Sequence, residues 1–100
     1  MILHVATFTL RDDVTTSQID AIDTALAALP ARIGALRSYS HGRDLGLRSG
    51  NGDYAVMALV DDADGLAGYL DHPEHVRAVQ TYVQPLVVTR QAVQIEADPL

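Results

Sequence analysis

The seven residues Tyr54–Val60 constrain the fold more than any other stretch of the chain. They read Tyr-Ala-Val-Met-Ala-Leu-Val, and they follow a glycine-rich segment that contains the turn signal Asn51-Gly52. A nearly continuous apolar run of this length is typical of a strand that is buried on both faces. The run therefore predicts an inner strand of a sheet, with protein packed against each side of it.

A second apolar strand is predicted over Ile2–Leu10. Its alternating side chains form two sets, one with His4 and Phe8 and the other with Leu3 and Val5. Because both sets contain apolar residues, we expect both faces of this strand to be at least partly covered as well.

Two less apolar strands complete the predicted sheet. The strand Leu36–Asp44 is rich in polar residues and places Tyr39 and His41 on one face. The glycine-rich segment 45–53 predicts a hairpin with a long loop that leads into the third strand. The last strand, Leu86–Glu96, has three apolar anchors, which are Val87, Val93 and Ile95.

Two helical segments lie between these strands. The first is Thr15–Leu29, where Thr15 and Gln18 form a capping-box pattern and Pro30 ends the helix. The apolar stripe of this helix consists of Ile19, Ile22, Leu26 and Leu29. The acidic run Asp61–Asp64 begins the second segment. We interpret it as helix capping rather than a metal site, because a calcium loop needs more oxygen ligands at set spacing.

The resulting order is strand, helix, strand, strand, broken helix, strand. That order predicts an α+β protein of the ferredoxin-like βαββαβ type, with a four-stranded antiparallel sheet. No linker, repeat or low-complexity tract interrupts it. We therefore expect one domain over residues 1–97 and a short C-terminal tail over residues 98–100.

The sheet has more apolar surface than two helical segments can hide. Helices cover only one face of such a sheet, and the opposite face is normally polar. Here the opposite face carries apolar side chains, namely Leu3, Val5, Ala55, Met57 and Leu59. Leaving such a patch in water is unusual for a monomer. The pattern predicts a symmetric homodimer in which two sheets pack together as a dimeric α/β barrel.

Composition narrows the range of functions. The 100 residues include no cysteine, which excludes disulfides, thiol nucleophiles and cysteine-based zinc sites. Thirteen acidic residues outnumber seven scattered arginines, with a formal net charge of -6, so we expect no nucleic-acid partner. No apolar run is long enough to span a bilayer, and the N-terminus does not resemble a signal peptide. We expect a cytoplasmic protein without a membrane partner.

The chemistry concentrates in the stretch Tyr69–His75, which reads Tyr-Leu-Asp-His-Pro-Glu-His. Pro73 disfavours helix at the preceding residue but suits the first position of a new helix. We therefore expect a helix to stop near Asp71 or His72, and His72 to cap a second helix that begins at Pro73. His75 would then lie in the first turn, where the helix dipole disfavours its charged form.

The segment Tyr69–Val76, the pair His4-Val5 and the segment Pro85–Val87 together resemble the stress-responsive dimeric alpha/beta-barrel family, often called Dabb. The resemblance extends from about Ile2 to Glu96, and its His-Pro-x-His element is the most specific part. It implies the same ferredoxin-like fold and a homodimer. Most members of the family have no assigned activity, so the resemblance indicates architecture more than chemistry.

The resemblance also implies candidate site residues. In a plant polyketide cyclase of the family, a tyrosine and a histidine of this segment promote an aldol condensation. Tyr69 and His75 fall on that pair, with His75 as general base and Tyr69 as the hydrogen-bond partner of the oxygen that gains charge. His4 matches a further pocket histidine. Val56 stands where the cyclase has another, so the resemblance does not extend to the whole pocket.

The same residues also have purely structural interpretations. His72 is expected mainly to cap its helix, and His75 could equally bond a backbone carbonyl. His4 could be a satisfied core histidine, and His41 could face solvent on an edge strand. We expect no metal at His72, Glu74 and His75, because the proline and the helix geometry splay these side chains.

These observations leave three hypotheses for function. The preferred one is a dimeric barrel that binds a small apolar or carbonyl-containing molecule, in a stress-response or secondary-metabolism setting and without an established reaction or cofactor. The second is a cyclase-like lyase or isomerase that uses His75 and Tyr69. The third is a purely structural oligomer. A pocket between sheet and helices would bring together the candidate binding residues, which are His4, Phe8, Tyr39 and His72.

Overall fold

The computed structural model describes residues 1–98. Its elements, in chain order, are β1 (Ile2–Leu10), α1 (Thr16–Ala27), β2 (Ser38–Arg43), β3 (Tyr54–Val60), α2 (Ala63–Leu70), α3 (Pro73–Ala78), the π-helical turn η1 (Val79–Val83), the 3-10 turn η2 (Gln84–Leu86) and β4 (Val87–Glu96). The predicted tail, apart from Asp98, lies outside the described residues. No helix of residues 1–98 is long and apolar enough to cross a membrane.

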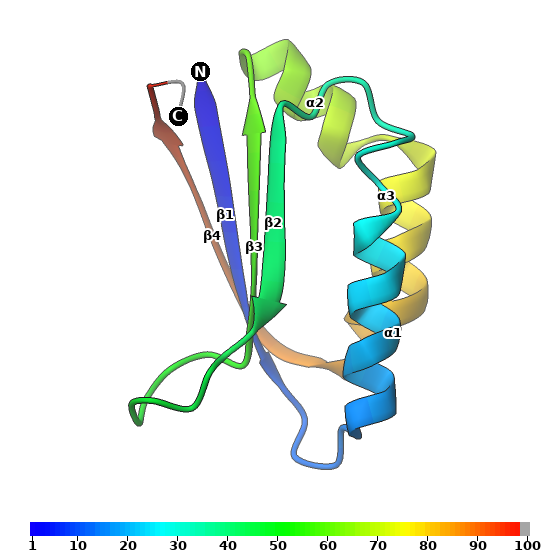
Figure 1. The fold of residues 1–100 in the computed structure, drawn as a ribbon, viewed down its shortest axis with the longest axis vertical. Coiled ribbons are helices and arrows are strands. Elements are labelled where there is room, and N and C mark those ends of the chain that lie inside the picture. Colours follow the sequence, from blue (N-terminus) through cyan, green and yellow to red (C-terminus); the bar gives the residue numbers. More distant parts are fainter. Residues whose placement is uncertain (99–100) are drawn as a thin grey trace.

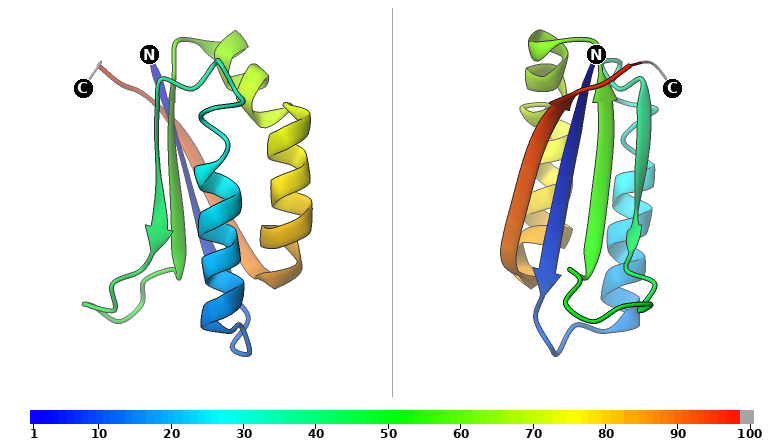
Figure 2. Two further views of the ribbon diagram at one scale, coloured as in Figure 1. Left: turned by 45° about the vertical axis from the view of Figure 1, so that its right-hand side comes forward. Right: turned by 90° about the vertical axis from the view of Figure 1, so that its left-hand side faces the viewer.

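The four strands form one antiparallel sheet in the order β2-β3-β1-β4. All helices lie on one face of this sheet, and the other face is left open (Figures 1 and 2). This arrangement confirms the predicted α+β ferredoxin-like fold. It places the broken helical segment α2–α3 and helix α1 over the same face, so a site between the layers draws residues from both.

Helix α1 begins as predicted. The Thr15 side chain accepts a hydrogen bond from the backbone of Gln18, and the Gln18 side chain accepts one from the backbone of Thr15. The helix ends at Ala27, two residues earlier than predicted, and Leu29 lies in the turn that follows. Leu29 is still fully buried, so the apolar stripe continues into the core beyond the end of the helix.

The second helical segment breaks where the proline predicts. Helix α2 ends at Leu70, α3 starts at Pro73, and Nδ1 of His72 caps α3 by accepting a hydrogen bond from the backbone of Glu74. Past this break, the helical spacing of Val76, Val79 and Val83 predicts that the apolar stripe continues, and this prediction is only partly correct. Val83 is buried, but Val76 faces outward and is 37% exposed.

The two sets of side chains on β1 divide as predicted. His4, Ala6, Phe8 and Leu10 are buried beneath the helices. Leu3 and Val5 face the open side, together with Val93 and Ile95, their partners on β4. The expectation that Tyr54–Val60 is covered on both faces does not hold within one chain. The side chain of Met57 is 41% exposed, because only one layer of helices is present.

Candidate functional site

A cavity of about 340 Å³ lies between the sheet and the helices. Small-molecule sites usually have volumes of about 300 Å³ or more, so this cavity lies at the lower end of their range. Every strand contributes to the lining, and so do α1 and the whole broken helical segment. The lining residues are His4, Ala6, Phe8, Leu26, Tyr39, Val56, Tyr69, Leu70, His75, Val79, Val83, Gln84, Val87 and Arg90.

The break between α2 and α3 brings Tyr69 and His75 together. The ring centroids of the two residues are 4.4 Å apart, with the ring planes tilted by 50°. Tyr69 is only 1% exposed, and its hydroxyl lies 3.2 Å from the hydroxyl of Tyr39 on β2. The chain bend therefore gives the proximity that sequence spacing alone could not establish.

One hydrogen bond defines the protonation state of His75. Its Nδ1 atom lies 3.0 Å from the carbonyl oxygen of Leu70. A carbonyl oxygen only accepts hydrogen bonds, so Nδ1 must carry the proton. In the neutral ring, Nε2 then keeps its lone pair. The bond to a backbone carbonyl, which was the structural interpretation, thus leaves a nitrogen available as a base.

Burial determines the charge of the groups around the cavity. It is the largest cause that lowers the pKa of His75, and the positive charge of Arg90 lowers that pKa further. The neutral state expected for His75 is therefore supported, with burial rather than the helix dipole as its main cause. Burial also raises the pKa of Tyr69, which keeps its hydroxyl protonated and able to donate.

His4 lies on the floor of the cavity and is fully buried. Its Nδ1 atom accepts a hydrogen bond of 2.8 Å from the side-chain amide of Gln94 on the neighbouring strand, which leaves the proton on Nε2. The ring meets that of Tyr69 edge-on, with centroids 6.2 Å apart. Burial lowers the pKa of His4, and the charge of Arg90 adds to this effect. His4 is thus both a satisfied core histidine and part of the cavity wall.

The other predicted site residues divide into two groups. Phe8 and Tyr39 line the cavity as expected, whereas His72 is not among the lining residues and its Nδ1 is occupied as a helix cap. His41 is half-buried rather than solvent-facing. Its Nδ1 lies 2.8 Å from the hydroxyl of Tyr54, which in turn donates to Asp23.

Arg90 and Gln94 were not among the residues predicted for the site. The apolar anchors of the last strand, Val87, Val93 and Ile95, all have odd numbers, so simple alternation would place them on one face of the sheet. A register shift between Thr9 and Leu10 breaks that alternation. Val87 faces the cavity, but beyond the irregularity the inward positions are those paired with Phe8 and His4, namely Arg90 and Gln94. Cross-strand pairing with β1 was the signal that could have found them.

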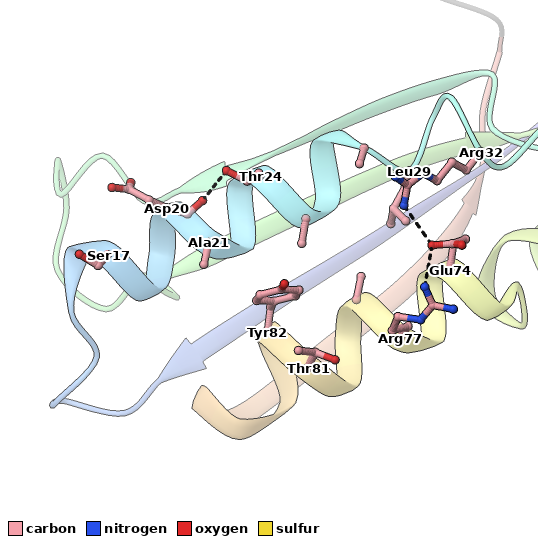
Figure 3. Close-up of a pocket in the computed structure, with 13 residues that line it drawn as sticks. Ser17, Asp20, Ala21, Thr24, Leu29, Arg32, Glu74, Arg77, Thr81 and Tyr82 are labelled. Carbon is pink, nitrogen blue, oxygen red and sulfur yellow. Dashed lines mark hydrogen bonds and ion pairs between the residues drawn. The ribbon is translucent and has the colours of Figure 1, made fainter.

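A second hollow, of about 640 Å³, is an open groove between α1 and the α3–η1 segment (Figure 3). Its charged side chains already have ion-pair partners, since Glu74 lies 3.1 Å from Arg32 and 3.6 Å from Arg77, and Asp20 pairs with Arg43 outside the groove. It contains no histidine. Within residues 1–98, no group of three metal-binding side chains is arranged to hold a metal ion. The cavity beneath the broken helix is therefore the candidate site.

Comparison with known proteins gives relatives over most of the chain. An uncharacterized protein of Streptomyces coelicolor is 36% identical over 81 residues, which cover 79% of this chain and 84% of the relative. A dimeric ferredoxin-like protein of unknown function from Thermobifida fusca is 44% identical, with a TM-score of 0.89 over 96% of this chain and 90% of that one.

More distant structures share only the fold. The hydroxynitrile lyase of Passiflora edulis superimposes with a TM-score of 0.80 over 98% of this chain and 96% of that one, but it is 15% identical. The sequence model of the stress-responsive A/B barrel domain (Dabb) matches residues 2–97 of this chain. The chain therefore belongs to the stress-responsive A/B barrel domain family.

Proposed function

We propose that the protein is a homodimer in which each protomer binds a small, largely apolar molecule with a carbonyl group, in the cavity between its sheet and its helices. The observation that carries this proposal is the composition of the cavity. Most of its lining is apolar, and the lining also includes a few polar groups, among them those of Tyr69, His75 and His4. An apolar pocket with a few polar groups is the usual form of a small-molecule site.

Homodimerisation is supported by the open face of the sheet. Met57, Val93 and Ile95 are between 41% and 53% exposed there, although all three are large apolar side chains. Burying apolar surface is favourable by about 25 cal/mol for each Å² removed from water. The similar protein from Thermobifida fusca is dimeric, which is consistent with a second copy as the partner of this face.

Binding is tested with aryl alkyl ketones such as butyrophenone, by titration calorimetry and by amide chemical shifts. The variant Val79→Phe places a larger side chain in the cavity and is expected to abolish binding. The matched control Ala21→Phe adds bulk in the groove between α1 and α3 instead, and it is expected to bind normally. Equal binding by both variants, with unchanged thermal unfolding, would place the ligand elsewhere.

A second function is favoured by the tautomer of His75. Its Nε2 lone pair can remove a proton alpha to a ligand carbonyl, and the C–H electron pair then moves into the enolate while Tyr69 donates a hydrogen bond to the enolate oxygen. Returning the proton to carbon completes an exchange or an isomerisation. If the enolate carbon instead adds to a second carbonyl of the same molecule, the π bond of that carbonyl breaks, its oxygen takes the proton back from His75, and the product is cyclic. Deuterium exchange at the alpha carbon in D₂O is the direct test.

A further inference from the structure

Among residues 1–98, Arg90 is the only cationic side chain that lines the cavity. The other arginines of the chain mostly hold carboxylates, and those that do are Arg11, Arg32, Arg37, Arg43 and Arg77. Within residues 1–98, by contrast, Arg90 forms no ion pair and no side-chain hydrogen bond. Among the described residues Arg48 has no such partner either, but it lies in the loop between β2 and β3, whereas Arg90 borders the cavity.

The strand register explains how Arg90 reaches the site. Arg90 pairs with Phe8 of β1. Phe8 lies on the face of the sheet beneath the helices, two positions along β1 from Ala6 and four positions from His4, which share that face. β4 is an edge strand, so the arginine is solvent-accessible while its side chain still borders the apolar interior. This position lets the aliphatic stem pack along the lining while the guanidinium stays hydrated in the free protein.

Nothing in the lining balances this charge. No aspartate or glutamate is among the lining residues. Burial lowers the pKa values of His4 and His75, and the positive charge of Arg90 lowers them further; the same charge opposes the rise that burial causes in the pKa of Tyr69, so its field extends across the cavity. Those histidines are neutral near pH 7 and add no charge of their own. The cavity is therefore apolar inside, with one uncompensated positive group at its edge.

We propose that Arg90 binds a carboxylate of the ligand, so that the substrate class is carbonyl compounds that also carry an acid group, such as aryl keto acids. This inference rests on the proposed function and specifies its ligand. The planar guanidinium suits bidentate binding of a carboxylate. With the acid group at Arg90, the apolar body of the ligand would fill the interior and its carbonyl would reach Tyr69 and His75.

The test uses a matched pair of probes, 4-oxo-4-phenylbutanoate and its primary amide. The two differ in charge but share the aryl ketone and the alpha carbon. We expect the wild-type protein to bind the acid at least about tenfold more tightly than the amide, the effect of one charge-assisted hydrogen-bond pair. The preference is expected to shrink with rising salt, because the guanidinium is partly exposed.

Two variants assign the preference to the residue. Arg90→Gln is expected to bind acid and amide equally, and Arg90→Lys is expected to retain part of the preference. The control Arg48→Gln removes the same charge from the loop between β2 and β3, and it is expected to keep the full preference. Circular dichroism and thermal unfolding verify that each variant is folded.

The outcomes separate the two proposals. If the wild-type protein binds butyrophenone and the amide as tightly as the acid, the inference about Arg90 is overturned while the proposed function stands. A preference for the acid that survives in Arg90→Gln also overturns it. If the protein binds none of these ketones, the proposed function fails, and the inference fails with it.

Discussion

The carbonyl oxygen of Leu70 accepts a hydrogen bond from Nδ1 of His75 across the break between α2 and α3, over 3.0 Å. The bond joins the last residue of one helix to the first turn of the next. It satisfies a carbonyl that the interrupted helix leaves without a partner, and it orients the imidazole above the cavity. A single contact thus connects the chain break with the protonation state of the candidate base.

The first prediction concerns the role of His75. The variant His75→Gln keeps a polar side chain but lacks a basic nitrogen, so alpha-proton exchange of a bound ketone is expected to fall by about 100-fold or more. The control His72→Asn retains a good helix cap and is expected to exchange at the wild-type rate. Exchange is followed by NMR in D₂O. Equal rates in wild type and His75→Gln would exclude this residue as the base.

The second prediction concerns stability against pH. The pKa values of His4 and His75 are lowered in the folded protein, so below the ordinary value of 6.5 the unfolded chain binds protons that the folded chain does not. The free energy of unfolding is therefore expected to decrease as pH falls from 6.5 towards 5, by at most about 1.4 kcal/mol per pH unit for each histidine. Well above pH 7 both histidines are neutral in the folded and in the unfolded chain, so neither makes the free energy of unfolding depend on pH.

Urea unfolding at pH 7.5 and pH 5.5 measures this decrease. In His75→Gln one of the two titrating groups is absent, so the loss of stability between these pH values is expected to be smaller than in the wild type. An identical loss in both proteins would show that His75 titrates at its ordinary pKa. The chosen window stays above the range in which most carboxylates titrate.

The third prediction concerns the start of α1. The Thr15 side chain accepts the Gln18 backbone N–H at 3.2 Å, so Thr15→Ala is expected to reduce the free energy of unfolding by about 1 kcal/mol. The neighbouring variant Thr16→Ala changes the same residue type at the first helical position and is expected to cost much less. Chemical denaturation distinguishes the two. Equal losses would mean that the capping bond contributes nothing.

The fourth prediction concerns the open face of the sheet. The variants Met57→Lys and Val93→Glu place a charge where a second copy is proposed to pack, and both are expected to convert the dimer into a monomer. The control Leu47→Glu adds a charge at a side chain that is 77% exposed in the loop between β2 and β3. It is expected to remain dimeric. Sedimentation velocity gives the answer, and a monomeric wild type would contradict the proposed assembly.

Much of the fold could be read from local chemistry. The cap of α1 at Thr15, the start of α3 at Pro73, the stop near Asp71 or His72 and the order of strands and helices along the chain all follow from patterns within a few residues. Pro73 also predicts the break between Tyr69 and His75, but the contact of their two rings is established by the folded structure and not by their spacing. The alternation of side chains along β1 also predicted correctly that His4 and Leu3 lie on opposite faces of the sheet.

The missed features are those that depend on pairing between distant segments. Arg90 reaches the cavity because it lies opposite Phe8, and Gln94 bonds His4 across the same pair of strands. The register shift at Thr9 and Leu10 cannot be inferred from the residues of the last strand alone. Helical spacing placed Val76 on the apolar stripe, but its side chain is 37% exposed.

The alternation of side chains along β1 has a consequence for the history of such proteins. Neighbouring residues of one strand serve separate purposes, since His4 lines the cavity while Leu3 and Val5 belong to the opposite side of the sheet. Substitutions at even-numbered positions can reshape what enters the cavity without disturbing the far side. Lineages that inherit this scaffold are thus free to diversify in chemistry while their mode of assembly stays constant.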